Sequence, residues 1–313
     1  MATANAIGYT GARPVFVDIT GADNLNLSPE DLARKVTPRT RAVMVVHYGG
    51  FAADMPAIQE VAERHGLAII EDCAHAPGAF YPAPAGQSRV GSLGTISCFS
   101  FFSNKNLTTG EGGMVATHNP ALADRVKIAR SHGMTSLTWD RHRGHSFSYD
   151  VVAPGYNYRL DELRAAIGII QLGRLDGNNA RRRTLTQLYR SNLRDLLQIH
   201  LPFLGDDLEA SACHIFPILL SDGEDRQDFM AFLKGRGIQT SIHYPPIHRF
   251  SYYRGLWVDK GNHRLPHTEE VAGRTVTLPL FPAMSEDQVE QVIAAVQDYY
   301  NKGIQAGHAY QSR

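Results

Sequence analysis

The chain has 313 residues, of which 43% are hydrophobic and 20% are charged, as in ordinary globular proteins. Its 31 lysines and arginines balance its 31 aspartates and glutamates, so no excess of charge favours nucleic acid or an anionic membrane as a partner. Cys73, Cys98 and Cys213 are too few and too scattered for a disulfide framework or a zinc site, which predicts a reducing compartment, by default the cytoplasm. The sequence has no run of about 18 apolar residues, and its start lacks the basic flank and the apolar run that are typical of a signal peptide.

The first half of the sequence alternates short apolar segments with helical ones. The opening segment ATANAI is typical of a helix interior, and further helices are predicted after the capping Ser28, at 55–65, and from Pro120 to about residue 133. Strands are predicted at 14–19, 42–46, 67–72, 95–101 and 112–117. Strands separated by helices of this length indicate a parallel α/β sheet, whose ligands lie beyond the carboxyl ends of the strands.

The second half begins with a long helical segment. Apolar residues recur at helical spacing from about 160 to 200, and those at 163–172 are predicted to lie in the core. A smaller α+β unit is predicted beyond it, with strands at 214–220, 238–244 and 275–281, a helix at 226–237, and a Ser285-capped helix that runs to about 301. We therefore predict a large domain at 1–180 and a small C-terminal domain at 181–313.

Two of the predicted strands lead into residues whose side chains could take part in catalysis. Asp72 and His75 follow an apolar strand in EDCAHAPGA, where a carboxylate is costly to desolvate unless a cation or a protonated group meets it. Lys105 lies five residues after Ser100 in SFFSNKNLTTGEGG, in a loop whose glycines allow a sharp bend. Taken singly, Asp72 could only cap a turn and Lys105 could be a solvated loop lysine.

Taken together, these residue types suit one cofactor. A lysine amine can form a Schiff base with an aldehyde, a carboxylate can hold a pyridine nitrogen protonated, and a hydroxyl can bind phosphate. Aldehyde, pyridine nitrogen and phosphate are the three groups by which a protein can hold pyridoxal 5'-phosphate. The sequence therefore favours this cofactor at the edge of the predicted sheet.

Five segments, in this order and at these separations, closely resemble the DegT/DnrJ/EryC1/StrS family: EDCAHAPGA, SFFSNKNLTTGEGG, GYNYRLDELRAAIG, SIHYPPIH and TLPLFP. The resemblance covers the chain from Ala2 to about residue 301. It implies an α/β, fold type I pyridoxal phosphate enzyme, with a mostly parallel sheet in the large domain and a smaller α+β C-terminal domain. It also implies an aminotransferase that converts a nucleotide-linked keto-sugar to an amino-sugar in polysaccharide or secondary-metabolite biosynthesis, with glutamate as the expected donor.

The resemblance assigns roles to individual residues. Lys105 is similar to the Schiff-base lysine, and Asp72 to the partner of the pyridine nitrogen, so these two are the expected catalytic residues. His75 matches a position near the cofactor ring and its phenolic oxygen, and Ser100 matches the serine that hydrogen-bonds the phosphate. Asn157 matches an asparagine that reaches the phosphate of the neighbouring subunit, which implies a homodimer with shared active sites.

Two alternatives to this activity stay open. Sugar dehydratases of the same family have a histidine in place of the Schiff-base lysine, whereas this sequence has Lys105. In complete relatives, the segment that matches ATANAI follows two sheet strands and a helix start whose amides bind the cofactor phosphate. The sequence is therefore expected to be truncated at its amino end, which would leave the strand at 14–19 without its usual neighbour. A non-catalytic remnant or a regulatory protein that binds sugar nucleotide is the alternative.

Four other histidines also suggest ligand binding. His142 and His145 have a metal-like spacing in DRHRGH, but they lack a cysteine or a clear carboxylate partner, so we predict a loop that covers the site rather than a metal site. His243 and His248 in SIHYPPIH could approach the substrate, and core or surface roles are equally open.

Overall fold

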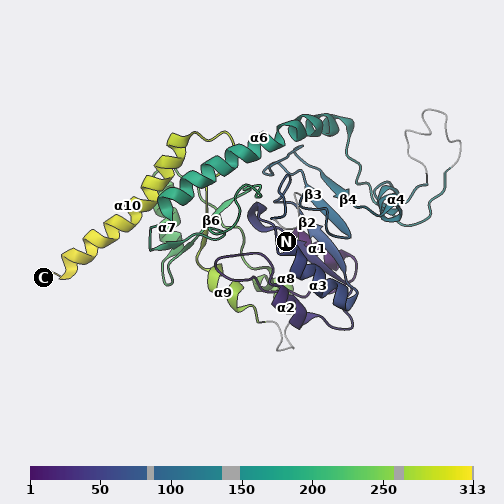
Figure 1. Ribbon diagram of the computed structural model, residues 1–313, viewed down its shortest axis with the longest axis horizontal. Coiled ribbons are helices and arrows are strands. Elements are labelled where there is room, and N and C mark those ends of the chain that lie inside the picture. The colour runs from purple at the N-terminus through teal and green to yellow at the C-terminus, as the bar shows by residue number, and fades with distance from the viewer. Residues whose placement is uncertain (83–87, 136–148, 257–263, 312–313) are drawn as a thin grey trace.

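The computed structural model describes residues 1–82, 88–135, 149–256 and 264–311. The segment DRHRGH, with His142 and His145, lies outside the described residues. Two sheets are present, and the long helix α6 (Glu162–Leu193) passes over both of them (Figure 1).

The first sheet is mostly parallel, as predicted. Its strands lie in the order β1 (Ala42–Val46), β2 (Ala68–Asp72), β3 (Ile96–Ser100) and β4 (Gly113–Ala116). The pairs β1–β2 and β2–β3 are parallel, whereas β4 runs antiparallel to β3. The carboxyl ends of β2 and β3 therefore meet at one edge of the sheet, which brings the segments after Asp72 and Ser100 together.

Helices α2 (Pro29–Lys35) and α3 (Met55–His65) belong to this first half. The Ser28 hydroxyl caps α2 by accepting a hydrogen bond from the backbone amide of Asp31, as the sequence predicts. Gly66 ends α3 in the left-handed conformation, at φ 64°. The apolar side of α3 is buried in one core cluster with alternate residues of β1 and β2: Val43, Val45, Met55, Ile58, Val61 and Ile69.

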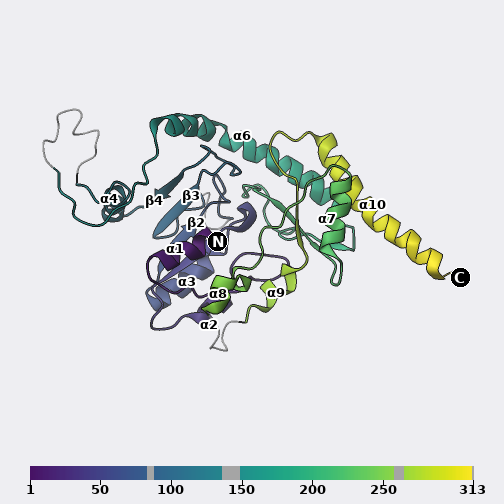
Figure 2. The ribbon, with the colours of Figure 1, turned by 180° about the vertical axis from the view of Figure 1, so that it is seen from behind.

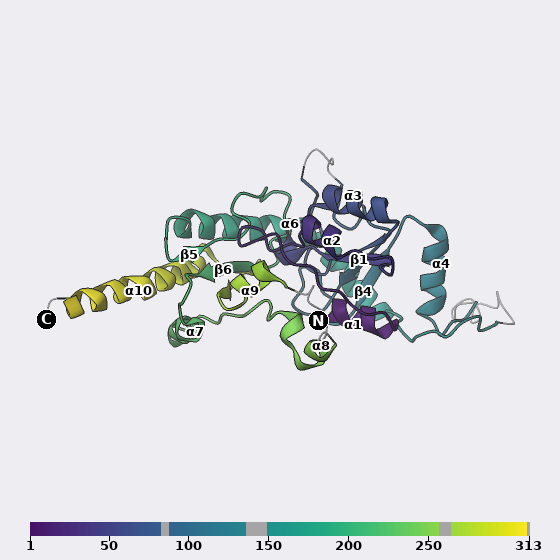
Figure 3. The ribbon, with the colours of Figure 1, turned by 90° about the horizontal axis from the view of Figure 1, so that it is seen from below.

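The second sheet is antiparallel and consists of β5 (Ile199–His200), β6 (Phe216–Leu220) and β7 (Thr275–Leu278). Residues of α7 (Arg226–Gly235), α10 (Glu286–Gln311) and the second half of α6 form one buried core with it. Helix α10 continues past the predicted end at residue 301, and its last turns project away from the rest of the molecule (Figures 1 and 3).

The remaining helices are α1 (Ala2–Tyr9), α4 (Pro120–Ala129), α8 (Ser251–Gly255), α9 (Pro266–Ala272) and the short 3-10 helices η1 (Tyr48–Gly50) and η2 (Ile247–Arg249). Helix α1 confirms the helical character of ATANAI. It lies beside α8, where Tyr253 donates a hydrogen bond to the side chain of Asn5 (Figure 2). This contact joins the start of the chain to its C-terminal half.

Two of the predicted strands are not formed. The segment 14–19 makes only an isolated bridge between Ile19 and Leu27, and the side chain of the buried Asp18 accepts hydrogen bonds from the backbone amides of His267 and Thr268 at the start of α9. The segment 238–244 makes only a bridge between Ser241 and Thr277. A run of apolar residues favours a strand, but pairing also requires a neighbour with free backbone groups.

The predicted core position of residues 163–172 is wrong for a single chain. Leu163 is 80% exposed and Ile169 is 72% exposed, and the first buried apolar residue of α6 is Leu175. The helix extends past the first sheet here, so no described element of the same chain covers its apolar side. Nowhere in the described ranges does a helix have both the length and the apolar character that a membrane crossing requires.

Candidate active site

Asp72 is the last residue of β2 and is half-buried. Its Oδ1 accepts a hydrogen bond from the backbone amide of Ala74 at 3.1 Å, and its Oδ2 accepts one from the hydroxyl of Thr3 at 2.8 Å. Each carboxylate oxygen can accept a further hydrogen bond, so both contacts orient the group without saturating it. The carboxylate of Asp72 therefore joins the turn after β2 to helix α1.

Lys105 follows β3 in a tight turn, in which its backbone amide donates to the carbonyl of Phe102 at 3.0 Å. Gly110 supports the next bend at φ 79°, a conformation that favours glycine. Burial lowers the pKa of the Lys105 ammonium group, and the charge of Asp72 opposes this shift in part. The amine is thus easier to deprotonate than that of a solvated surface lysine, as a nucleophile requires.

A cavity of about 510 Å³ opens beside Lys105, between the first sheet, α6 and the second sheet. Asp72, His75, Ser100 and Asn157 do not line it. Lys105 therefore lies between two parts of the structure, the sheet edge that carries Asp72 and a separate polar cavity.

His75 is buried near Lys105. Its Nδ1 accepts a hydrogen bond from the backbone amide of Gly49 at 3.4 Å, and its Nε2 lies 3.0 Å from the hydroxyl of Tyr244. Burial, helped by the nearby Lys105 and His243, lowers the pKa of His75 to about 3. The imidazole is therefore neutral, and Nε2 carries the hydrogen that is donated to Tyr244.

Ser100 ends β3 and lies at the same sheet edge as Asp72. Its hydroxyl oxygen accepts a hydrogen bond from the backbone amide of Phe102 at 3.3 Å, so its hydrogen remains available for another acceptor. Asn157 is exposed and forms an isolated backbone bridge with Ser131 after α4. The structure thus brings Asp72, His75, Ser100 and Lys105 to one edge of the sheet, and it does not bring Asn157 to that edge.

Two further polar residues of this region are not apparent from the sequence. The imidazole of His214 packs against that of His75 in a tilted arrangement, with ring centroids 4.4 Å apart, and its Nδ1 lies 2.8 Å from the side-chain oxygen of Asn106. Burial, with the nearby His75 and Lys105, holds the pKa of His214 well below its usual range. The sequence offers one signal for His214, a histidine at the start of an apolar segment. That segment, 214–220, is predicted as a strand, so the histidine does not stand out as a site residue.

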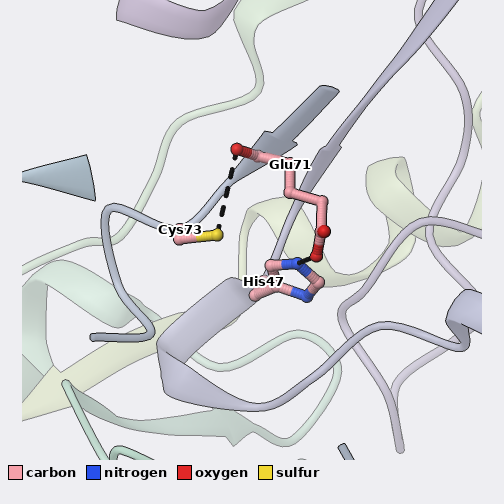
Figure 4. Close-up of side chains that lie close together, drawn as sticks. All are labelled: His47, Glu71 and Cys73. Carbon is pink, nitrogen blue, oxygen red and sulfur yellow. Dashed lines mark hydrogen bonds and ion pairs between the residues drawn. The ribbon is translucent and has the colours of Figure 1, made fainter. Parts of the chain in front are cut away.

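Glu71 and Cys73, which flank Asp72 in the sequence, form a buried polar cluster with His47 (Figure 4). Glu71 accepts hydrogen bonds from His47 Nε2 at 2.9 Å, from the Tyr81 hydroxyl and from backbone amides of the loop 91–94. The other nitrogen of His47 accepts from the Ala53 amide, and burial raises the pKa of the Cys73 thiol. Since its donor atoms are already engaged, this cluster is a structural brace for the end of β2 rather than a metal centre.

A mostly parallel sheet with a half-buried lysine and a carboxylate at its carboxyl edge defines a class of enzyme. The fold is that of the fold type I pyridoxal phosphate-dependent aminotransferases, which confirms the predicted fold class. Helicobacter pylori PseC, an aminotransferase involved in the biosynthesis of pseudoaminic acid, matches with a TM-score of 0.87 at 27% identity, over 96% of this chain and 77% of PseC. The PLP form of Spr1654 from Streptococcus pneumoniae matches with a TM-score of 0.83 at 27% identity, over 96% of this chain and 78% of Spr1654.

The chain belongs to the DegT/DnrJ/EryC1/StrS aminotransferase family, whose model matches residues 1–297. It is 40% identical over 301 residues to the spore coat polysaccharide biosynthesis protein SpsC of Bacillus subtilis (strain 168), a match that covers 95% of this chain and 76% of SpsC. The family resemblance read from the sequence motifs is confirmed.

Proposed function

We propose that this protein is a pyridoxal phosphate-dependent aminotransferase that converts a nucleotide-linked keto-sugar to an amino-sugar, with glutamate as the amino donor. The observation that carries the proposal is the half-buried Lys105, whose amine has a lowered pKa and interacts with Asp72 at the carboxyl edge of the sheet. The names of SpsC and PseC support a role in making sugars for polysaccharides or related products.

The residues at the sheet edge fit pyridoxal phosphate by their chemistry. When bound, this cofactor supplies an aldehyde that amines attack and a ring that accepts electrons from the adjacent carbon. Asp72 would hold the ring nitrogen protonated, and Ser100 would donate its free hydroxyl hydrogen to the phosphate. His75, which is neutral, would lie near the ring without adding charge.

Lys105 would then have two roles in the reaction. Its Nζ would bond the cofactor while no substrate is present, and the released amine would move a proton to and from the substrate carbon. The lowered pKa suits both roles, because bonding the cofactor and taking a proton from the substrate carbon each require the neutral amine.

Thr3 supports Asp72 in this scheme through the 2.8 Å hydrogen bond to Oδ2. We expect Thr3→Val, which keeps the shape but removes the hydroxyl, to weaken cofactor binding and lower the rate about 10-fold, as loss of one hydrogen bond to a charged group does. Thr3→Ser should restore both. Cofactor titration by absorbance and the rate of amine transfer check this, and a fully active Thr3→Val would contradict the role.

The surface around Asn157 supports a homodimer. Exposed apolar side chains cluster on β4, on the segment before α6 and on the first half of α6, and include Met114, Val115, Tyr156, Tyr158, Leu163, Ile167, Ile169 and Ile170. Soluble monomers seldom expose such a surface, and a second copy of the chain is the proposed occupant. Asn157 lies within this surface, in the segment that the family resemblance places at the partner's phosphate.

Mixing two inactive variants should test the sharing of sites. We expect Lys105→Ala and Asn157→Asp to be inactive alone, the second because its charge repels the phosphate. In a mixed dimer one site carries both defects and the other carries neither, so activity should return as subunits exchange. If exchange is demonstrated between folded dimers and no activity returns, Asn157 does not serve the partner's site.

We also propose that the chain has two domains with different roles. We place their boundary near residue 180, within α6, so that residues 1–180 hold the cofactor and residues 181–313 complete the substrate site.

The three cysteines of the chain form no disulfide bond. Free thiols agree with the proposal that the protein acts in the reducing cytoplasm.

The direct test of the function supplies the protein with pyridoxal phosphate, glutamate and a panel of nucleotide-linked keto-sugars. We expect one equivalent of 2-oxoglutarate for each equivalent of amino-sugar, measured by mass spectrometry, and no product from Lys105→Ala. Binding of sugar nucleotide without either product would favour the non-catalytic alternative.

A further inference from the structure

The charged side chains that line the cavity beside Lys105 are all cationic. The cavity contains two cationic side chains, Lys105 and Arg182, and no aspartate or glutamate among the residues that form its wall. The rest of the lining is largely amides, hydroxyls and the end of β7 with the segment after it. An anionic, hydrogen-bonding ligand matches such a wall better than an apolar or cationic one.

Arg182 is the unusual member of this lining. It is 6% exposed, and its Nη1 donates to the carbonyls of Cys213, His214 and Leu280 at 3.3, 3.0 and 3.0 Å. Its Nε is buried without a hydrogen-bond partner, and the hydrogen bonds that Arg182 makes in the part of the chain that the structure describes all come from Nη1. No carboxylate of the described residues pairs with it. Burial lowers the pKa of Arg182 to about 10, so the guanidinium is still charged at neutral pH.

The unpaired edge of Arg182 has the shape of a carboxylate receptor. The Nε–H and Nη2–H groups point to the same side of the guanidinium plane, and two parallel hydrogen bonds from such an edge match the two oxygens of a carboxylate. The three carbonyls on Nη1 fix the plane. A buried charge without a counter-ion is costly, and a ligand carboxylate would remove that cost.

His214 adds a second fixed contact. Asn106 donates through Nδ2 to Asn179 and to the carbonyl of Ala212, so its Oδ1 is the acceptor and His214 donates from Nδ1. The Nε2 of His214 is thus an acceptor, and among the described residues it has no donor. The cavity therefore combines a cation for a carboxylate with a neutral imidazole that can accept from an ammonium or hydroxyl group.

We propose that this cavity is a binding site for a carboxylate of the amino-acid donor, with Arg182 as its anchor. The inference rests on the proposed function, because it explains how a donor is held with its amine near Lys105. It assigns the anionic co-substrate to the space between the two sheets.

Binding can be measured without turnover. We expect calorimetry to show that the protein binds succinate and 2-oxoglutarate but not the neutral succinamide. Arg182→Gln should weaken dicarboxylate binding roughly 10- to 100-fold, the effect of losing hydrogen bonds to a charged group. Equal binding of succinamide and succinate, or no binding of either dicarboxylate, would overturn the proposal.

A second variant avoids the loss of the three carbonyl contacts. Asn178 lies one helical turn before Arg182 on α6 and lines the same cavity. Asn178→Asp would supply an internal counter-ion, so we expect dicarboxylate binding to weaken while the fold is kept. Asn192→Asp, an exposed position further along α6, is the charge-matched control and should bind like the parent protein. Unchanged binding in Asn178→Asp would contradict the assignment.

The outcome for this site can be separated from the outcome for the function. Covalent attachment of pyridoxal phosphate to Lys105 is measured on the parent and on Asn178→Asp. Attachment in both, with weaker dicarboxylate binding only in Asn178→Asp, supports both proposals. Attachment in the parent without any preference for dicarboxylates overturns only the cavity assignment, whereas failure of attachment in the parent overturns the proposed function.

Discussion

Replacing Lys105 by alanine should abolish amine transfer, because the variant has no amine to bond the cofactor or to move the proton at the substrate carbon. General acid–base transfer alone contributes about 10²–10⁴-fold to a rate, and the loss of covalent attachment adds to that. Lys105→Arg should be equally inactive, since a guanidinium stays protonated and does not bond the aldehyde. Product formation from glutamate and a keto-sugar, followed by mass spectrometry, is the measurement.

Lys127→Ala is a suitable control for this experiment. Lys127 is an exposed lysine on α4 that pairs with Asp124 three residues earlier on the same helix. Its removal leaves the sheet edge intact, so full activity is expected. Retained transfer in either Lys105 variant would disprove the role of this residue.

Asp72→Asn should separate the electronic role of the carboxylate from its part in binding. An asparagine can still accept hydrogen bonds from Thr3 or from the amide of Ala74, but it cannot hold a pyridine nitrogen protonated. We expect the rate to fall by about 10²–10³, as when a single preorganised electrostatic contact is removed. Cofactor affinity should fall much less.

Both quantities can be measured on the same sample of the Asp72 variant. Absorbance titration gives cofactor affinity, and single-turnover kinetics with saturating cofactor give the rate. Equal losses in affinity and rate would show that Asp72 is structural. A loss confined to affinity would contradict the assigned role as well.

Local sequence patterns were sufficient to predict much of the first sheet. The strands that end at Asp72 and Ser100 are short segments rich in apolar residues, and their parallel pairing brings the segments that carry Asp72 and Lys105 to one edge of the sheet. The cap at Ser28 and the helix end at Gly66 follow from residue type alone. These features depend on neighbours in the chain.

Features that depend on distant partners were missed. Thr3 meets Asp72 across 69 positions, and Arg182 meets the carbonyl of Leu280 across 98. The residues at 163–172 have a core-like pattern, yet they are exposed in the single chain because helical spacing does not reveal what covers a helix. Asp18 is a further case, since its buried carboxylate accepts a hydrogen bond from the start of a helix 249 positions later in the sequence.

The central claim is that Lys105, at the carboxyl edge of the sheet and beside Asp72, holds pyridoxal phosphate. The most direct measurement adds this cofactor, reduces the complex with borohydride, digests the protein and locates the modified peptide by mass spectrometry. We predict that the mass of the reduced cofactor is found on Lys105 and that Lys105→Ala remains unmodified. An unmodified Lys105 in the folded parent protein, or modification confined to exposed lysines such as Lys127, would contradict the account.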